Sequence, residues 1–452
     1  MLENKQKFYS FIKKYLPWLA LGLALFLTNS QHRLGSDEGV ILNAAWNIYH
    51  DRKLYYDTFE FIAPGAPYLL AWWWKLTAPS YLMAAFLGYL VSFSSLVGLF
   101  LISQQLKIKR WKFLAPTLFI IASSFWQLLD HNNLNIAAII WSLYFLLVGL
   151  DKDKEKLFLS GLFSGLAVLF TQHRGLIAGV VFIIYLLILK IKGKIPLSKI
   201  IIFISGFILP LLSLFIFWEP KILYDSLIKF PFLNYHETNI LPLTLWYWSL
   251  TSLLLVIILI YKKTNPDNKN QLILFSLLNF GLLLSALTRP DASHILQSLI
   301  SFLILIAWLL EIYFYKLRYQ LIIYTLLLFI IMFRCLWPPL ENLNVWYLVK
   351  TIKKVCPNSE KIYVGPFMPG VYFQMRTLSI TPYSFLITNQ HTPEQFNKAL
   401  EIIKQEPPSC AILNYTLVKK FNYNKNNPLD NFFKEEYTVV RELGDITILI
   451  KK

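Results

Sequence analysis

The stretch LPWLALGLALFLTNSQHRLGSDEG, residues 16–39, decides the fold of this chain. It opens with an apolar run that ends at Thr28, crosses a short polar segment and reaches the adjacent acids Asp37 and Glu38. An apolar run of this kind suits a lipid bilayer, and carboxylates just beyond its end face water at the membrane surface. The stretch therefore predicts a membrane protein with its chemistry at one membrane face.

The composition extends this prediction to the whole chain of 452 residues, of which 56% are hydrophobic and only 15% charged. Only helices or closed barrels satisfy every backbone polar group in lipid, and long apolar runs such as residues 82–102 and 200–217 select helices. Since one span needs about 20 apolar residues, we expect about eleven spans. They lie near residues 15–30, 81–103, 113–129, 134–150, 157–171, 175–190, 198–218, 243–261, 271–287, 292–311 and 320–338.

Lysine and arginine gather in alternate loops and so predict an orientation. Clusters at residues 107–112, 152–156, 190–199 and 262–269 share one side with the N-terminal lysines. Because loops rich in Lys and Arg stay in the cytoplasm, we expect a multi-pass protein of the plasma (inner) membrane with a cytoplasmic N-terminus. The net charge of +17 then reflects topology, and no nucleic acid is needed to explain it.

Two apolar segments allow a second interpretation. The first run follows Lys13 and Lys14 as a signal peptide would, but no small-x-small cleavage site comes after it, so we expect an uncleaved helix. Residues 64–79 (PGAPYLLAWWWKLTAP) are apolar enough to be interpreted as a twelfth span. This segment is short, bounded by prolines and rich in tryptophan, which predicts an interfacial helix within a first outer loop at about residues 31–80.

After residue 339 the apolar runs shorten to strand length. We expect a transmembrane domain over residues 1–339 and a small α/β domain over residues 340–452, with strands at 361–365, 410–414, 437–441 and 446–450. Thr392 and Gln395 fit a capping box at a helix start. An odd number of spans places this domain outside the cytoplasm, where Cys356 and Cys410 can form a disulfide or remain separate core residues.

Ionisable residues gather in the loops that are expected outside. Acids and bases that come from separate loops can converge at one cavity, where some accept a proton and others hold a phosphate. The candidates are Asp37, Glu38 and Asp57 in the first loop, Asp130 and His131 in the second, His173 and Arg174 in the third, and Arg289, Asp291 and His294 in a late loop.

Part of the first loop resembles the GT-C superfamily of integral membrane glycosyltransferases. The motifs SDE at residues 36–38, LYYD at 54–57 and PGAPY at 64–68 are similar to the first outer loop of the protein O-mannosyltransferase and aminoarabinose transferase branch. The resemblance covers the whole chain in architecture but only residues 36–68 in motif. The usual Gly-x-x-Tyr-x-Asp motif of the family has no glycine here, and residues 63–66 replace its usual Lys-Pro-Pro-Leu. Because of these differences, the motifs do not identify the sugar that is transferred.

The resemblance implies an enzyme that moves a sugar from a polyprenyl phosphate donor to a lipid, glycan or protein acceptor at the outer face. Direct displacement would invert the anomeric carbon, with Asp37 as base and Glu38 beside it. It further implies roles for the other candidates: His173, Arg174 and Arg289 for the donor phosphate, and Asp57, Asp130, His131, Asp291 and His294 for acceptor or second-loop positions. Relatives differ in their use of a metal, and Asp37, Glu38 and Asp130 can hold Mg²⁺ or Mn²⁺ if the loops bring them together.

Two other functions stay open at this point. A transporter or flippase of lipid-linked sugars would also be polytopic and basic, but it favours polar residues in mid-span and repeat symmetry. An O-antigen polymerase or ligase would rely on a large late outer loop with arginines. The clustering of polar residues at the outer rim and the acidic pair in the first loop favour the transferase.

Overall fold

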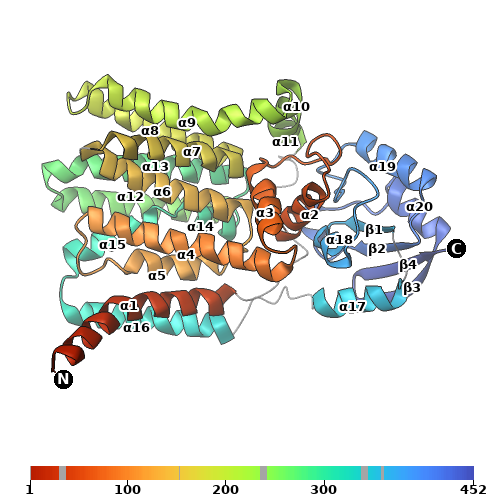
Figure 1. The fold of residues 1–452 in the computed structure, drawn as a ribbon, viewed down its shortest axis with the longest axis horizontal. Coiled ribbons are helices and arrows are strands. Elements are labelled where there is room, and N and C mark those ends of the chain that lie inside the picture. The colour runs from red at the N-terminus through yellow and green to blue at the C-terminus, as the bar shows by residue number, and fades with distance from the viewer. Residues whose placement is uncertain (1, 30–36, 152, 235–241, 337–344, 358–360) are drawn as a thin grey trace.

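The computed structural model describes residues 2–29, 37–151, 153–234, 242–336, 345–357 and 361–452. Figure 1 shows a bundle of long helices on one side, a smaller region with a β-sheet on the other, and short helices between them. The described chain is therefore mostly helical, with strands confined to its C-terminal region, as the sequence predicts.

The bundle is built from helices that run roughly side by side (Figure 1). The long helices are α1 (Leu2–Asn29), α4 (Tyr81–Gln105), α6 (His131–Asp151), α7 (Lys154–Phe170), α8 (Gln172–Ile191), α9 (Leu197–Phe217), α12 (Thr244–Lys263), α13 (Pro266–Ser285) and α16 (Leu317–Leu336). The shorter ones are α5 (Leu114–Ser123), α14 (Ala292–Ser298) and α15 (Phe302–Tyr313). After α9 come α10 (Pro220–Tyr224), a π-helical turn (Asp225–Lys229) and α11 (Phe230–Asn234), and a 3₁₀ turn (Ala286–Thr288) follows α13.

Each of the eleven predicted spans falls on a described helix, but the number of spans is not confirmed. Seven described helices are long and apolar enough to cross a membrane, and the pair α14 and α15, bent by 64°, adds an eighth if it counts as one span. The predicted span 113–129 is helical only over α5, and the predicted span 292–311 is broken at residues 299–301. A segment can thus be apolar enough to predict a membrane span although its residues do not form one straight helix.

Glycines allow two of the bundle helices to lie unusually close together. A Cβ atom on Gly161 of α7 would lie 2.0 Å from the carbonyl oxygen of Phe203 in α9, and one on Gly206 of α9 would lie 2.2 Å from the carbonyl oxygen of Phe158. Gly161 and Gly165 are four residues apart and share one helix face. The α7–α9 contact is therefore a small-xxx-small packing of the kind that membrane helices use.

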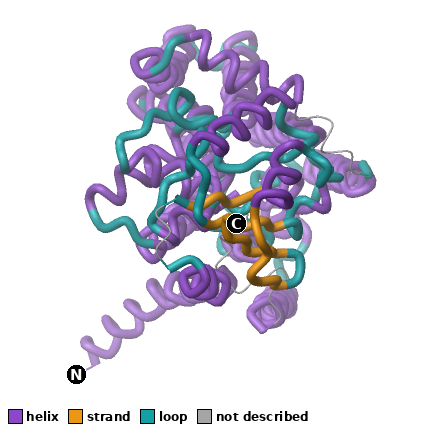
Figure 2. The backbone as a smooth tube through the Cα atoms, turned by 90° about the vertical axis from the view of Figure 1, so that its right-hand side faces the viewer, coloured by secondary structure: helices purple, strands orange, loops and turns teal. Residues whose placement is uncertain are grey.

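The C-terminal region folds around a four-stranded sheet, which Figure 2 shows in front of the helices. Its strands are β1 (Ile362–Pro366), β2 (Cys410–Asn414), β3 (Tyr437–Leu443) and β4 (Ile446–Lys451), in the order β1-β2-β4-β3. β1 and β2 are parallel and the other pairs are antiparallel. The four predicted strands are confirmed to within two residues.

Helices cover both faces of this sheet. Alternate residues of the strands point to opposite sides, so that Ile362 and Val364 pack with α17 (Val345–Val355) and α18 (Gly370–Met375). Tyr363 packs on the other side with α19 (Pro393–Gln405) and α20 (Pro428–Glu436). The predicted capping box at the start of α19 is confirmed, and Cys356 and Cys410 form a disulfide that joins the end of α17 to β2.

The first loop lies between the bundle and the C-terminal region. It contains α2 (Asp37–Tyr49) and α3 (Gly65–Leu76), the helix predicted to be interfacial. The indole nitrogen of Trp46 donates to the carbonyl of Thr377 at 3.0 Å, Phe59 N donates to the carbonyl of Pro382 at 2.8 Å, and the rings of Trp74 and Phe373 stack 4.7 Å apart. These contacts fix the loop from the side of the C-terminal region.

Glu60 is a buried acid at this junction. Its side chain is only 4% exposed, and Ser384 Oγ donates to its Oε1 at 3.1 Å. The other oxygen, Oε2, has no hydrogen-bond partner among the described residues. Burial raises the pKa of Glu60 to about 8, although the hydrogen bond from Ser384 opposes the rise. The first loop therefore holds this carboxyl largely protonated at neutral pH.

We predict that Gly161→Ala destabilises the bundle by about 1–3 kcal/mol, because the added methyl group must force α7 and α9 apart. Thermal unfolding of the purified protein in detergent measures the loss. Gly22→Ala is the control, since its methyl group would meet only the side chains of Tyr89 and Phe93, at 3.0 Å and 3.4 Å. Equal melting temperatures for the two variants would contradict the close packing of α7 on α9.

We predict that Glu60→Gln flattens the dependence of stability on pH. Between the ordinary pKa of 4.5 and the folded value of about 8, the folded chain holds a proton that the unfolded chain has lost. Stability therefore decreases as pH rises through this window, by up to a few kcal/mol. Melting temperatures from pH 5 to pH 9 should fall less steeply for the variant, and identical slopes would refute the burial of an unpaired carboxyl.

Candidate functional site

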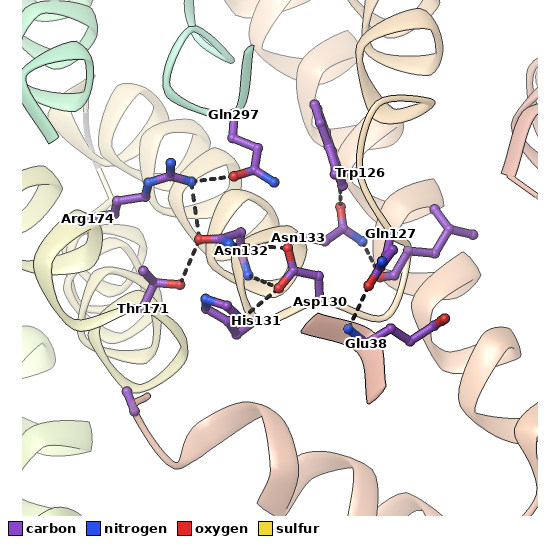
Figure 3. Close-up of polar contacts among 12 residues, drawn as sticks. Glu38, Trp126, Gln127, Asp130, His131, Asn132, Asn133, Thr171, Arg174 and Gln297 are labelled. Carbon is purple, nitrogen blue, oxygen red and sulfur yellow. Dashed lines mark hydrogen bonds and ion pairs between the residues drawn. The ribbon is translucent and has the colours of Figure 1, made fainter. Parts of the chain in front are cut away.

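The turn before α6 brings an acid, a base and an amide together. Asp130 is 4% exposed, and one of its oxygens lies 2.7 Å from Nδ1 of His131. The backbone and side-chain nitrogens of Asn132 donate to the carboxylate at 3.3 Å and 3.2 Å. Burial raises the pKa of Asp130, but the charge of His131 and these hydrogen bonds outweigh it and hold the pKa at about 2. Asp130 is thus a buried anion at neutral pH, and Figure 3 shows its contacts with His131 and Asn132.

Arg174, the third residue of α8, joins this turn to α14. Its side chain is 2% exposed, and Nη1 donates to the amide oxygens of Asn132 and Gln297 at 3.2 Å and 2.8 Å (Figure 3). Nη2 donates to the carbonyl of His294 at 3.2 Å. Thr171 donates to the same oxygen of Asn132 at 3.4 Å. One guanidinium therefore fixes the relative positions of α6, α8 and α14.

The late loop forms a second charged group. Asp291 caps α14 by accepting from the backbone nitrogen of His294 at 2.9 Å, and its Oδ1 lies 2.7 Å from Nδ1 of the same residue. Arg289 Nε lies 3.0 Å from the other carboxylate oxygen. Burial raises the pKa of Asp291, but the contacts with His294 and the charge of Arg289 lower it well below its usual value. Arg289 also lies 5.9 Å from the ring of Phe421 in the C-terminal region.

The acidic pair sits at the first turn of α2, and its two members face different surroundings. Burial lowers the pKa of His131, but its contacts with Asp130 and, to a smaller extent, the charge of Asp37 raise it, so Asp37 lies within electrostatic range of His131. Glu38 is 4% exposed and accepts from Tyr81 OH at 3.1 Å, while its backbone nitrogen donates to Gln127 Oε1 at 2.6 Å. Asp37 therefore lies within electrostatic range of the charged cluster, whereas Glu38 is bound to Tyr81 of α4.

Most of the residues that the sequence singles out do converge. Asp37, Asp130, His131, Arg174 and His294 form one cluster with Arg289 and Asp291, and the charges of Arg174, His131 and His294 also act on His173. Asp57 does not join them. It is exposed and accepts from the backbone nitrogen of Lys53 at 2.7 Å, which is the contact of a local turn.

The residues of this cluster do not fit a metal ion. Among the described residues, no group of three or more His, Cys, Asp and Glu side chains is placed to ligate one. Asp130 is bound by His131 and Asn132, and Glu38 by Tyr81, so the three carboxylates expected to share an ion do not share one point.

Several residues of the cluster escape sequence reasoning. Gln297 lies inside an apolar segment, where a polar residue is unusual and could have signalled the site. Tyr81 and Gln127 look like ordinary helix-end and loop residues, and only the fold brings them to Glu38. Arg334, near the end of α16, donates to the hydroxyl and carbonyl oxygens of Ser124 at 3.1 Å each, a contact between residues 210 positions apart in the sequence.

The fold with this arrangement of loops is also found in solved structures of other proteins, which the expected architecture anticipates. No protein-family model and no curated protein matches the sequence. Among solved structures, the chain is similar to the aminoarabinose transferase ArnT from Cupriavidus metallidurans, both in its apo state and bound to undecaprenyl phosphate. The TM-scores are 0.61 and 0.59, the identities 12% and 11%, and each match covers 97% of this chain and 98% of the other.

The chain is also similar to the oligosaccharyltransferase AglB from Archaeoglobus fulgidus, in a complex with an inhibitory peptide and a dolichol-phosphate. Here the TM-score is 0.56 and the identity 10%, over 89% of this chain and 70% of the other. A structure of that archaeal enzyme with zinc and sulfate matches with a TM-score of 0.55 and 10% identity, over 93% and 71% of the two chains. At these identities the likeness establishes the fold.

We predict that Arg174→Lys lowers the stability of the bundle by about 1.5–3 kcal/mol, the usual range for hydrogen bonds to a charged group. The single ammonium group of lysine cannot reproduce the hydrogen bonds that the planar guanidinium donates to Asn132, Gln297 and the carbonyl of His294. The measurement is thermal unfolding in detergent, with Arg318→Lys as control, because Arg318 is exposed at a distant helix start. A variant as stable as the control would show that Arg174 does not brace these helices.

Proposed function

We propose that this protein is a glycosyltransferase that moves a sugar from a polyprenyl phosphate donor to a hydroxyl group of an acceptor. The observation that carries the proposal is the buried cluster of Asp130, His131 and Arg174, with Asp37 of the first loop within electrostatic range of His131. A carboxylate that can accept a proton thus lies next to groups that can hold a phosphate. A similar fold is seen in ArnT bound to undecaprenyl phosphate, which supports a lipid-linked donor.

The cluster is suited to an anion because the positively polarised N-termini of several helices lie there. The helices α2, α6 and α8 begin at the cluster, and the N-terminus of a helix carries a partial positive charge. Arg174 and Arg289 add full positive charges. We infer that the donor phosphate binds among Arg174, Arg289 and His173, with His131 and His294 at its edge.

The chemistry that fits these parts is one displacement. The oxygen of the acceptor hydroxyl attacks the anomeric carbon, the bond from that carbon to the phosphate oxygen breaks, and the hydroxyl proton passes to Asp37. The arginines stabilise the negative charge that develops on the leaving phosphate. Because attack and departure take place on opposite faces of the anomeric carbon, the product has inverted configuration.

The site would face the outside of the plasma (inner) membrane. The basic loops at residues 107–112 and 190–199 lie at the helix ends opposite the cluster, which agrees with a cytoplasmic position for those loops. The disulfide between Cys356 and Cys410 supports an oxidising location for the C-terminal region. The acceptor can be a lipid, a glycan or a protein, since the site requires only a hydroxyl group.

We predict that Asp37→Asn lowers the turnover number by about 10²–10⁴-fold, the usual contribution of a general base, while donor binding remains. The assay is the release of polyprenyl phosphate from a panel of polyprenyl phosphate sugars by the purified protein in detergent, with and without EDTA. Asn cannot accept the proton, but it keeps the size of the side chain.

The matched control is Asp51→Asn, the same change in the same loop, at an acid whose side chain is 92% exposed and 3.9 Å from Lys75. The control should turn over like the wild type. If Asp37→Asn keeps pace with it, Asp37 is not the base. If the wild type consumes no donor, the transferase proposal fails, and transport of lipid-linked sugars in proteoliposomes becomes the function to test.

A further inference from the structure

A helical segment outside the predicted spans exposes a stripe of large apolar side chains. Residues 220–234, which comprise α10, the π-helical turn and α11, form one continuous helix. Four of its apolar side chains are between 54% and 81% exposed, namely Tyr224, Ile228, Phe232 and Leu233. The first three recur every four residues and so share one side of the helix. Surfaces in water rarely carry contiguous apolar patches, so this stripe indicates that another apolar phase covers it.

The other side of this helix is packed against the protein. The buried ring of Phe230 lies 4.8 Å from the ring of Phe59 and 5.4 Å from that of Phe61, both in the first loop. Gln172, the first residue of α8, donates through Nε2 to the carbonyl of Leu227 at 3.4 Å. The helix is thus held against the first loop and the start of α8, and the stripe lies on the side that the protein leaves uncovered.

The helix begins next to a lipid-facing helix end. α9 is long and apolar enough to cross a membrane, and its last three residues, Phe215, Ile216 and Phe217, are each more than half exposed. Trp218 and Glu219 separate α9 from α10, a step that spans at most about 11 Å. Figure 1 shows α10 and α11 at the end of α9 that is nearer the C-terminal region. The stripe therefore continues the apolar surface of α9 where α9 leaves the membrane.

The helix α3, which the sequence predicts to be interfacial, lies beside the start of α10. The rings of Tyr68 in α3 and Trp218 lie 5.5 Å apart. α3 also exposes large apolar side chains, those of Trp72 and Leu76. Aromatic side chains and amphipathic helices favour the boundary between headgroups and acyl chains. Two neighbouring helices outside the spans thus carry the same kind of exposed surface.

Lysines border the stripe. Lys221 and Lys229 are exposed on the same helix, and Lys229 Nζ also lies 3.8 Å from a carboxylate oxygen of Asp225. A lysine can lay its apolar stem along lipid while its ammonium group reaches the headgroups. The cores of protein interfaces, in contrast, are depleted of lysine. An apolar stripe with this border therefore fits a bilayer surface better than it fits a protein partner.

We propose that residues 220–234 lie in the surface of the bilayer on the side of the C-terminal region. The stripe enters the lipid by about 5–10 Å, the depth of the boundary between headgroups and acyl chains, and the two lysines reach the headgroups. Because Phe230 and Gln172 join this helix to the first loop and to α8, the bilayer then fixes the depth of both.

The test measures the depth of single sites in the full-length protein, reconstituted in vesicles of phosphatidylcholine and phosphatidylglycerol. Ile228→Cys and Phe232→Cys are each labelled with a fluorophore in a Cys335→Ser background, because Cys356 and Cys410 are bonded to each other. Lipids with a nitroxide near the headgroup should quench both labels, and should cause a larger loss of fluorescence than lipids with a nitroxide at the end of the acyl chain.

Two exposed apolar residues serve as matched controls. Val439→Cys is on β3, which Figure 1 shows far from the bundle, and neither lipid should quench its label. Phe217→Cys is at the lipid-facing end of α9, and its label should be quenched. The melting temperature of each labelled variant checks that the protein is folded.

Labels at residues 228 and 232 that are quenched no more than the label at residue 439 overturn the proposal. If these labels escape quenching and the two cysteine variants instead form disulfide-linked dimers, a second copy of the chain covers the stripe, and the assignment to lipid is wrong. The measurement requires no sugar transfer, so its result is separate from the function proposed above.

Discussion

The burial of the Arg174 guanidinium is the constraint on which the site depends. A cation in the first turn of a helix is on the unfavourable end of the helix dipole, and removing it from water costs several kcal/mol. The cost is offset because oxygens of Asn132, Gln297 and His294 come from two other helices to meet it. The positions of α6 and α14 relative to α8 are therefore determined by one side chain, and the charged loops at their ends are held together as a consequence.

The C-terminal region completes the site from the other side. Trp46, Phe59 and Glu60 of the first loop contact residues 377–384, and Arg289 of the late loop contacts Phe421. Without these contacts, the loop that carries Asp37 would be bound only along its membrane side. The C-terminal region is far from the cluster in sequence, yet its residues 377–384 contact the loop that supplies the proposed base.

The sequence was a good guide wherever one local property sufficed. Apolar runs located the helices, and strand-length runs located all four strands, because burial and periodicity are properties of neighbouring residues. It was a weaker guide for spans, since α5 is short and the helix after Asp291 breaks at residues 299–301. It also identified Asp130 and Arg174 as candidates, because charged residues at membrane ends are conspicuous.

What the sequence could not provide was the direction of each side chain. Asp37 and Glu38 look like one feature, but successive residues of a helix point about 100° apart, so a pair in the first turn of α2 cannot serve a single point. Glu38 is bound by Tyr81 and Gln127, which are neutral residues of different elements. No pattern of charges in the sequence therefore predicts these contacts. Gln297 is also neutral, and its only signal in the sequence is its position within an apolar segment.

The division of the acidic pair has a consequence for the chemistry. A displacement with inversion needs the base on one face of the anomeric carbon and the phosphate on the other, with the ring held between them. If both acids pointed into the phosphate cluster, their charges would repel the donor phosphate. With Glu38 bound to Tyr81, the acid of this pair whose charge acts on His131 is Asp37. The helix geometry of α2 thus allows two adjacent acids to serve two different purposes.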